Sequence, residues 1–217
     1  MISSSLFLIR SDPLISGLIS FGRRIIKVLI EIIEESITDL PQYEKVSIAF
    51  RVETRFRITP IENGLGGLIF TEEAVRSYVK DYDAFETERP AFWLKRFDIS
   101  RWGIFSARED GRRIGGAAVA WDTLEVEMLE GRKDLACLWD LRVHSEYRNK
   151  GVGRKLFSYA VDWARERQCH QLKIETQNIN VPACRFYARQ GCELRGINRY
   201  AYGETLDETQ LLWYLDL

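Results

Sequence analysis

The sequence predicts one α/β domain over residues 25–217, preceded by an extension over residues 1–24. Three observations predict this class. Segments with alternating or β-branched apolar residues recur along the chain, as they do in strands. Residues 151–167 carry apolar side chains at helical spacing, and turn residues separate the two kinds of element. The order of the elements is that of an α/β domain and differs from a doubly wound nucleotide-binding fold.

The first half of the domain has the weaker patterns. Pro41 suits a helix start, because proline needs no N–H at the first helical position. Thr71, Glu72 and Glu73 have the composition of a helix N-terminus. The elements expected here are, in order, a strand over 25–33, a helix over 40–50, a short strand over 52–58, a loop over 63–67, a helix from 71 to about 81, and an irregular stretch or helical turn over 91–98.

The second half has clearer patterns. Glu109-Asp110-Gly111 is a strong hairpin signal between two strand-like segments. Val152 and Leu156 begin the apolar face of a helix, and Asn180 and Gly191 suit the cap and the stop of another. The elements expected here are strands over 102–108, 113–121 and 136–143, a helix over 151–167, a strand over 171–177, a helix over 180–190, and strands over 192–202 and 208–216.

The charge balance narrows the class of partner. The 217 residues include 31 Lys and Arg and 32 Asp and Glu, which gives a net charge of -1. A general nucleic-acid or membrane-surface binder normally carries a basic excess, so we expect neither partner. Hydrophobic residues make up 46% of the chain, which is enough for a sizeable core.

The cysteines and the N-terminal segment indicate in which cellular compartment the protein is expected. The four cysteines form no CxxC pair and only two histidines accompany them, so we expect no metal and read reduced thiols in a cytoplasmic protein. Residues 1–33 are rich in Ile, Leu and Phe, but the longest uncharged run, Pro13–Gly22, falls short of the ~20 residues of a membrane span. No clear signal peptide is present. Association of the extension with a membrane surface is the alternative.

The stretch Leu138–Gly153, LWDLRVHSEYRNKGVG, combines a strand, a charged turn and a glycine-spaced loop that opens a helix. Backbone N–H groups at a helix start have no intrahelical partner, and the helix dipole adds partial positive charge there. Gly151 and Gly153 let the backbone approach a ligand closely, and three basic side chains add full charge. The stretch therefore predicts a phosphate cradle.

Two motifs here resemble the signatures of the GNAT superfamily of acetyl-CoA-dependent N-acetyltransferases. Arg148-Asn-Lys-Gly-Val-Gly153 fits the pattern R/Q-x-x-G-x-G/A between the fourth strand and the next helix. Asn180-Val-Pro-Ala-Cys-Arg-Phe-Tyr187 fits the second signature. The running similarity of LWDLRVHSEYRNKGVG, LKIETQNINVPACRFYARQG, INRYAY and QLLWYLDL is to the streptothricin acetyltransferase branch of this superfamily.

The resemblance implies a fold and a co-substrate. The fold would be a central mixed, mostly antiparallel sheet flanked by helices, with the fourth and fifth strands splayed apart. Acetyl-CoA would bind with its pyrophosphate on the backbone N–H groups from Arg148 to Arg154 and its pantetheine arm along the fourth strand. The cofactor-binding residues expected on this basis are Leu141, Arg142, Val143, Arg148, Asn149, Lys150, Gly151, Val152, Gly153, Arg154, Asn180 and Tyr187.

The resemblance and the chemistry of acetyl transfer together suggest catalytic groups. A main-chain N–H of the fourth strand would polarise the thioester, and Tyr187 would protonate the departing thiolate. An alkyl amine with a pKa of ~10.4 must lose a proton before it attacks. Asp140 and Glu175, on neighbouring strands, are both candidates for that base or for binding the cation. A structural pair with Arg142 or Lys173 is the alternative for each carboxylate.

The expected activity is acetyl transfer, by direct attack in a ternary complex, to a primary amine of a cationic small molecule. The resemblance implies streptothricin-type antibiotics, acetylated on their β-lysine amine, as the substrate class. Two alternatives stay open, namely a peptide or protein N-acetyltransferase and an acetyl-CoA-binding sensor or interaction module without turnover. The protein is expected to be a monomer or a homodimer.

Overall fold

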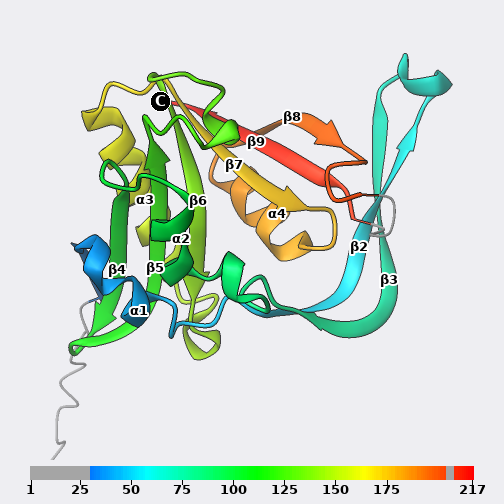
Figure 1. Cartoon of the computed structure of the whole chain (residues 1–217). Helices are drawn as coiled ribbons and strands as arrows, with labels where there is room; N and C mark the ends of the chain where they lie inside the picture. Colours follow the sequence, from blue (N-terminus) through cyan, green and yellow to red (C-terminus); the bar gives the residue numbers. More distant parts are fainter. Residues whose placement is uncertain (1–29, 204–207) are drawn as a thin grey trace, which may run out of the picture.

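The chain folds around a seven-stranded sheet with a separate two-stranded arm, as seen in a computed structural model that describes residues 30–203 and 208–217 (Figure 1). The extension over 1–24 and the first residues of the strand expected over 25–33 lie outside the described residues. Neighbouring strands of the sheet are antiparallel except β6 and β7. In spatial order the strands are β1 (Ile30–Glu34), β4 (Gly103–Glu109), β5 (Arg112–Trp121), β6 (Leu135–Val143), β7 (Gln171–Gln177), β9 (Gln210–Asp216) and β8 (Glu193–Asn198).

Helices cover both faces of the sheet, and a hydrophobic cluster fills each interface. On one face Leu156 and Trp163 pack with residues of the strands, and on the other Tyr43 and Trp93 do so. The helices are α1 (Leu40–Tyr43) and α2 (Pro90–Arg96) on the second face, and α3 (Val152–Glu166) and α4 (Val181–Arg189) on the first (Figure 1). Single 3₁₀ turns are η1 (Ile37–Asp39), η2 (Glu62–Gly64), η3 (Glu86–Glu88), η4 (Glu127–Leu129) and η5 (Ser145–Tyr147). None of the helices over 30–203 and 208–217 is long and apolar enough to cross a membrane.

The second half of the domain agrees with the sequence prediction. The hairpin, the strands β6, β7 and β9 and the helices α3 and α4 begin and end within one or two residues of the expected bounds. Asn180 Oδ1 accepts a hydrogen bond from the Ala183 N–H at 3.2 Å, so the predicted helix cap is confirmed. The strand expected over 192–202 is shorter, because β8 ends at Asn198.

The arm contradicts one prediction. The helix expected from 71 to about 81 is wrong, because these residues belong to β3 (Leu68–Lys80), which pairs with β2 (Phe50–Pro60). Glu73, which locally suits a helix start, forms ion pairs across the arm with Arg55 and Arg57 on β2. Cross-strand pairing therefore outweighs the local helix signal.

The helix expected over 40–50 is also too long, because α1 ends at Tyr43. Two carbonyl groups of the segment that follows α1 bond to arginines. Arg142 Nη1 donates to the Val46 carbonyl at 3.0 Å, and Arg148 Nη2 donates to the Ala49 carbonyl at 2.7 Å. These bonds hold the segment after α1 in a non-helical path to the arm.

The parallel strands β6 and β7 pair over only part of their length. Their register runs from Leu135 opposite Gln171 to Leu138 opposite Ile174, although β6 continues to Val143. A bulge in β6 lies at the same point, because the pairing with β5 shifts register between Leu138 and Asp140. The expected splay is confirmed, because β6 and β7 are the strands that correspond to the fourth and fifth strands of the family. We call the opening beyond Leu138 and Ile174 the split.

A buried ionic cluster fastens the α1 face to β6. Arg142 is 1% exposed, and its guanidinium donates to Asp140 Oδ1 at 2.9 Å and Oδ2 at 2.7 Å. It also donates to Asp83 Oδ2 at 2.8 Å. The Tyr43 hydroxyl donates to Asp140 Oδ1 at 2.6 Å. The cluster of Tyr43, Asp83, Asp140 and Arg142 therefore joins β6 to α1 and to the segment that follows β3.

The charges of this cluster depend on one another. Burial alone lowers the pKa of Arg142, but Asp140 and Asp83 more than offset this effect and raise it. Burial raises the pKa of Asp83 above its usual range, and Arg142 opposes the rise. Removal of the one cation of this cluster would leave the buried Asp140 and the half-buried Asp83 without their partner, which is a costly change.

We predict that Arg142→Met lowers the free energy of unfolding by about 3–5 kcal/mol, the cost of breaking a buried ion pair by removing one partner. Denaturant unfolding measures the change. Arg165→Met is the matched control, because Arg165 pairs with Asp162 on the exposed side of α3. That pair should contribute less than about 0.5 kcal/mol. Equal losses for the two variants would contradict the role given to the cluster, and Asp83→Asn replaces Arg142→Met if the latter fails to fold.

Candidate active site

The loop that joins β6 to α3 has a backbone suited to an anion. Asn149 and Gly151 adopt left-handed conformations, with φ of 61° and 85°. The Lys155 N–H donates to the Gly151 carbonyl at 3.1 Å, which is the start of the α3 ladder. The amides just before Lys155 therefore have no acceptor within the helix, and no side chain caps the helix at Gly151. Amides arranged in this way at a helix start bind phosphate groups.

The space and charge around this loop also fit a diphosphate. A Cβ atom placed on Gly151 would meet no atom within 4 Å, so the loop is open on that side. Lys150 and Arg154 are exposed. Arg148 turns inward, and its Nε donates to the Val143 carbonyl at 3.1 Å. Burial lowers the pKa of Arg148, but from so high a usual value that the group stays charged. Arg148 thus fixes the base of the loop, while its neighbours supply the exposed charge.

Tyr187 reaches inward from α4. It is 7% exposed and packs against Phe157 and Phe186 with ring centroids 5.9 Å and 5.1 Å away. Within the described part of the chain its hydroxyl makes no hydrogen bond. Burial raises the pKa of Tyr187 well above its ordinary value. The nearby charge of Asp140, which lies on the part of β6 that borders the split, adds to the rise. The phenol therefore keeps its proton at neutral pH and has a free donor.

Tyr82, from the segment after β3, contacts the β7 side of the split. Its hydroxyl donates to Gln177 Oε1 on β7, and a side-chain hydrogen bond joins it to Asn180. Burial raises the pKa of Tyr82 above its ordinary value, and the bond with Asn180 opposes the rise. Asn180 Oδ1 caps α4, and the amide N–H₂ of Asn180 is left to donate to Tyr82 or to a ligand.

Glu175 is the first residue on the β7 side of the split. Its Oε1 accepts a hydrogen bond from the Tyr202 hydroxyl at 2.6 Å, and its Oε2 accepts one from Gln210 Nε2 at 2.7 Å. Lys173, two residues earlier on the strand, pairs with Glu130 at 2.6 Å instead. No Lys, Arg or His among the described residues forms an ion pair with Glu175. Within the part of the chain that the structure describes, this carboxylate is therefore held by neutral donors and forms no ion pair.

Asp140 and Arg142 have different surroundings from Glu175. The Asp140 oxygens are bonded by Arg142 and Tyr43 in the buried cluster, which is the structural pair named above as the alternative for this carboxylate. The Arg142 side chain is held in the same cluster, and its backbone lies opposite Gly116 of β5. The side chains of Leu141 and Val143 are half-buried and pack with the α3 face of the core.

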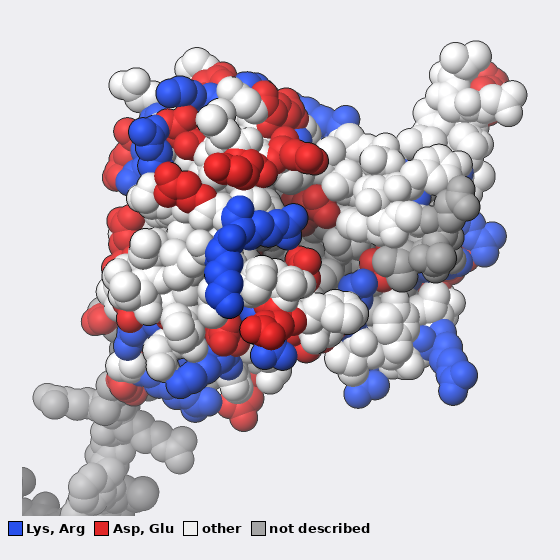
Figure 2. All heavy atoms as spheres, viewed as in Figure 1, with Lys and Arg blue, Asp and Glu red and all other residues white. Residues whose placement is uncertain are grey.

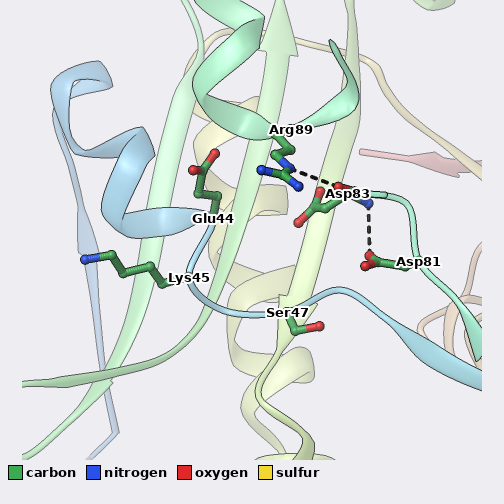
Figure 3. Close-up of a pocket in the computed structure, with 6 residues that line it drawn as sticks. All are labelled: Glu44, Lys45, Ser47, Asp81, Asp83 and Arg89. Atoms are coloured by element: carbon green, nitrogen blue, oxygen red, sulfur yellow. Dashed lines mark hydrogen bonds between the residues drawn. The ribbon is translucent and has the colours of Figure 1, made fainter. Parts of the chain in front are cut away.

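The α1 face carries a hollow of about 270 Å³ next to the cluster (Figure 3). Asp83 lies at the border, because it bonds Arg142 through its carboxylate and accepts from Arg89 Nε through its carbonyl at 3.0 Å. The hollow is lined by Glu44, Lys45, Ser47, Asp81, Asp83 and Arg89. Figure 2 shows acidic and basic side chains interspersed over this face, so no field of one sign covers it. No group of three His, Cys, Asp or Glu side chains within the described ranges is arranged to hold a metal ion.

The structure thus gathers some of the sequence-predicted residues around the split and not others. Tyr187, Asn180 and Glu175 surround it, whereas Asp140 and the Arg142 side chain are bonded into the cluster. Sequence reasoning missed the residues that contact them, which are Tyr43, Tyr82, Asp83, Tyr202 and Gln210. Tyr202 and Gln210 lie in stretches that had been singled out, INRYAY and QLLWYLDL, but nothing in either stretch indicated their roles.

Comparisons with known proteins show the family of the chain. The acetyltransferase (GNAT) family model matches residues 70–192, more than half of the chain. The streptothricin acetyltransferase of Escherichia coli is 37% identical over 93 residues, which cover 42% of this chain and 53% of that protein. An uncharacterized N-acetyltransferase of Archaeoglobus fulgidus is 33% identical over 129 residues, which cover 55% of this chain and 84% of that protein. The chain spans about half the length of the streptothricin acetyltransferases that it matches.

A solved structure extends the likeness to the whole fold. It is a protein of Bacillus anthracis, assigned as a streptothricin acetyltransferase, in complex with acetyl coenzyme A. It aligns with a TM-score of 0.67 and 26% identity, covering 88% of this chain and 98% of that one. The predicted fold and family are confirmed. The chain therefore belongs to the acetyltransferase (GNAT) family.

Proposed function

We propose that this chain transfers an acetyl group from acetyl-CoA to a primary amine of a cationic small molecule. One contrast at the split carries the proposal. Among the described residues, Tyr187 has a protonated hydroxyl without a partner, and Glu175 forms no ion pair. An available acid and an unpaired carboxylate at the opening of a GNAT sheet suit the acetylation of an amine.

Acetyl-CoA supplies a thioester whose acetyl carbonyl is the electrophile. The free amides around Gly151, with Lys150 and Arg154 beside them, would hold its diphosphate. Within the split, the main-chain groups of Leu141 and Val143 that face β7 have no strand partner. These groups would bond the pantetheine arm. A main-chain N–H there would meet the negative charge that develops on the acetyl oxygen.

The proton transfers are assigned to two side chains. Glu175 takes the proton that the substrate ammonium must lose, directly or through one water. The amine nitrogen then forms its bond to the acetyl carbon, the carbon–sulfur bond breaks, and Tyr187 gives its proton to the sulfur. Asp140 is the poorer base, because both of its oxygens already accept hydrogen bonds inside the cluster.

The substrate class rests on charge and on likeness. An unbalanced carboxylate attracts a cationic acceptor, and the Escherichia coli relative is named for its action on streptothricin. We extend that class to this chain as the leading candidate, with the β-lysine amine as the acceptor. A lysine peptide represents the alternative of a peptide or protein acceptor.

A thiol-release assay with acetyl-CoA tests the function. We expect turnover with streptothricin, less with a simple polyamine and least with a lysine peptide, because the substrate class proposed from the relatives is the streptothricin type. Fastest turnover with the peptide would move the assignment to a peptide N-acetyltransferase. Tight acetyl-CoA binding without thiol release across a broad amine panel would leave only a sensor, and would refute the enzyme.

We expect Tyr187→Phe to lower kcat about 100-fold, the lower end of what general acid catalysis contributes. A thiolate with an ordinary pKa near ~8.5 leaves without extreme help, which is why we choose the lower end. The affinity for acetyl-CoA, measured by calorimetry, should stay within about twofold. Tyr159→Phe on α3 is the control, because that ring packs on Phe105 away from the split. Unchanged kcat in Tyr187→Phe would remove the acid role.

We expect Gly151→Glu to weaken acetyl-CoA binding by roughly 100-fold or more. Like charges about 4 Å apart near a protein surface repel by several kcal/mol, and the added carboxylate would face the diphosphate. Gly111→Glu is the matched control, because Gly111 also has positive φ (76°) and open space but lies in the β4–β5 turn. Calorimetry checks the affinities. Equal affinity in the two variants would place the diphosphate elsewhere.

A further inference from the structure

A chain of hydrogen bonds leads to Glu175 from separate parts of the fold. Tyr82 Oη donates to Gln177 Oε1, Gln177 Nε2 donates to Tyr202 Oη at 2.9 Å, and Tyr202 Oη donates to Glu175 Oε1 at 2.6 Å. Gln210 Nε2 holds the other Glu175 oxygen at 2.7 Å. Both carboxylate oxygens are therefore fixed by neutral donors.

The direction of this chain follows from the donors that each group has. A phenol carries one proton, and Tyr202 gives its proton to Glu175 while its oxygen accepts from the Gln177 amide. Gln177 presents its N–H₂ to Tyr202 while Tyr82 holds its carbonyl oxygen. If the amide were reversed, its oxygen would compete with Glu175 for the Tyr202 proton. Tyr82 thus sets the direction of every later bond.

Tyr202 is suited to remain a donor. It lies in the segment between β8 and β9, 27 residues along the chain from Glu175. Burial and the charge of Glu175 raise the pKa of Tyr202 well above its ordinary value, so the phenol stays protonated. Each Glu175 oxygen keeps a further lone pair for a ligand, because a carboxylate accepts about four hydrogen bonds in all.

We propose that Tyr202 is a positioning residue that holds the Glu175 carboxylate in one orientation toward the acceptor amine, with Gln177 and Tyr82 directing its donor. The inference rests on the proposed function. Glutamate side chains are flexible, and a carboxylate that is already held loses less freedom when the amine arrives. Because the holding groups are neutral, they fix the position of the charge without cancelling it.

Steady-state kinetics of four variants test this role. They are Tyr202→Phe, Tyr200→Phe, Glu175→Gln and the double variant Glu175→Gln with Tyr202→Phe. Tyr202→Phe should lower kcat/KM for the acceptor about tenfold, the loss expected of one hydrogen bond to a charged group, with KM for acetyl-CoA unchanged. In the Glu175→Gln background the same change should have little further effect, because Tyr202 acts through Glu175. Tyr200 is 76% exposed on the same segment, so its variant should match the wild type.

Two kinetic results would overturn the proposal. One is an unchanged kcat/KM in Tyr202→Phe, and the other is the same loss in both backgrounds, which a general structural role would give. Crystal structures of the Tyr202→Phe and Tyr200→Phe variants add a readout independent of turnover. The Glu175 carboxylate should move in the first and stay in the second, and an unmoved carboxylate in the first refutes the role. If the wild type acetylates no amine, the proposed function fails while these structures still decide the role of Tyr202.

Discussion

The end of the parallel pairing after Leu138 and Ile174 is the constraint on which the rest of the site depends. Before that point β6 and β7 satisfy each other's backbone groups. Beyond it the β6 groups that face β7 have no strand partner, and unpaired backbone groups inside a protein are costly. Such an opening persists where another molecule or side chains supply the bonds. In the proposed function the pantetheine arm supplies them on one side, while Glu175 and Tyr82 border the other.

The bulge at Trp139 decides which side chains of β6 face the opening. Strict alternation from Leu138, which faces α3, would turn Asp140 toward α3 as well. The extra residue reverses this, so Asp140 and Arg142 point toward α1 and join the buried cluster. The cluster in turn ties down the segment of Tyr82 through Asp83. One bulge therefore places Asp140 in the buried cluster, and the cluster anchors the segment that carries Tyr82.

The sequence predicts the structural elements that neighbouring residues determine. It predicts less well the contacts between residues that are far apart in the chain. The loop from Arg148 to Gly153 needs only glycine spacing and a helix start, and the Asn180 cap is equally local, so both elements could be read directly. Glu73 also has a local signal, for a helix, but its partners on β2 come from a distant segment and the signal is wrong. The contacts around Glu175 are of the distant kind, since Tyr82 is 95 residues from Gln177. No spacing rule relates such residues before the chain is folded.

In the proposed function, the neutral partners of Glu175 leave its carboxylate able to attract a cation. Other carboxylates nearby form structural ion pairs. Asp140, Glu130 and Glu208 each bond a basic side chain, and that cation cancels most of their attraction for a substrate. Glu175 instead accepts hydrogen bonds from a tyrosine and a glutamine, and neither of these neutral side chains brings a positive charge. An arginine in place of Tyr202 would hold the carboxylate more strongly, yet it would repel the ammonium substrate of the proposed function. Neutral donors are therefore the arrangement that both fixes this group and keeps it attractive to an amine.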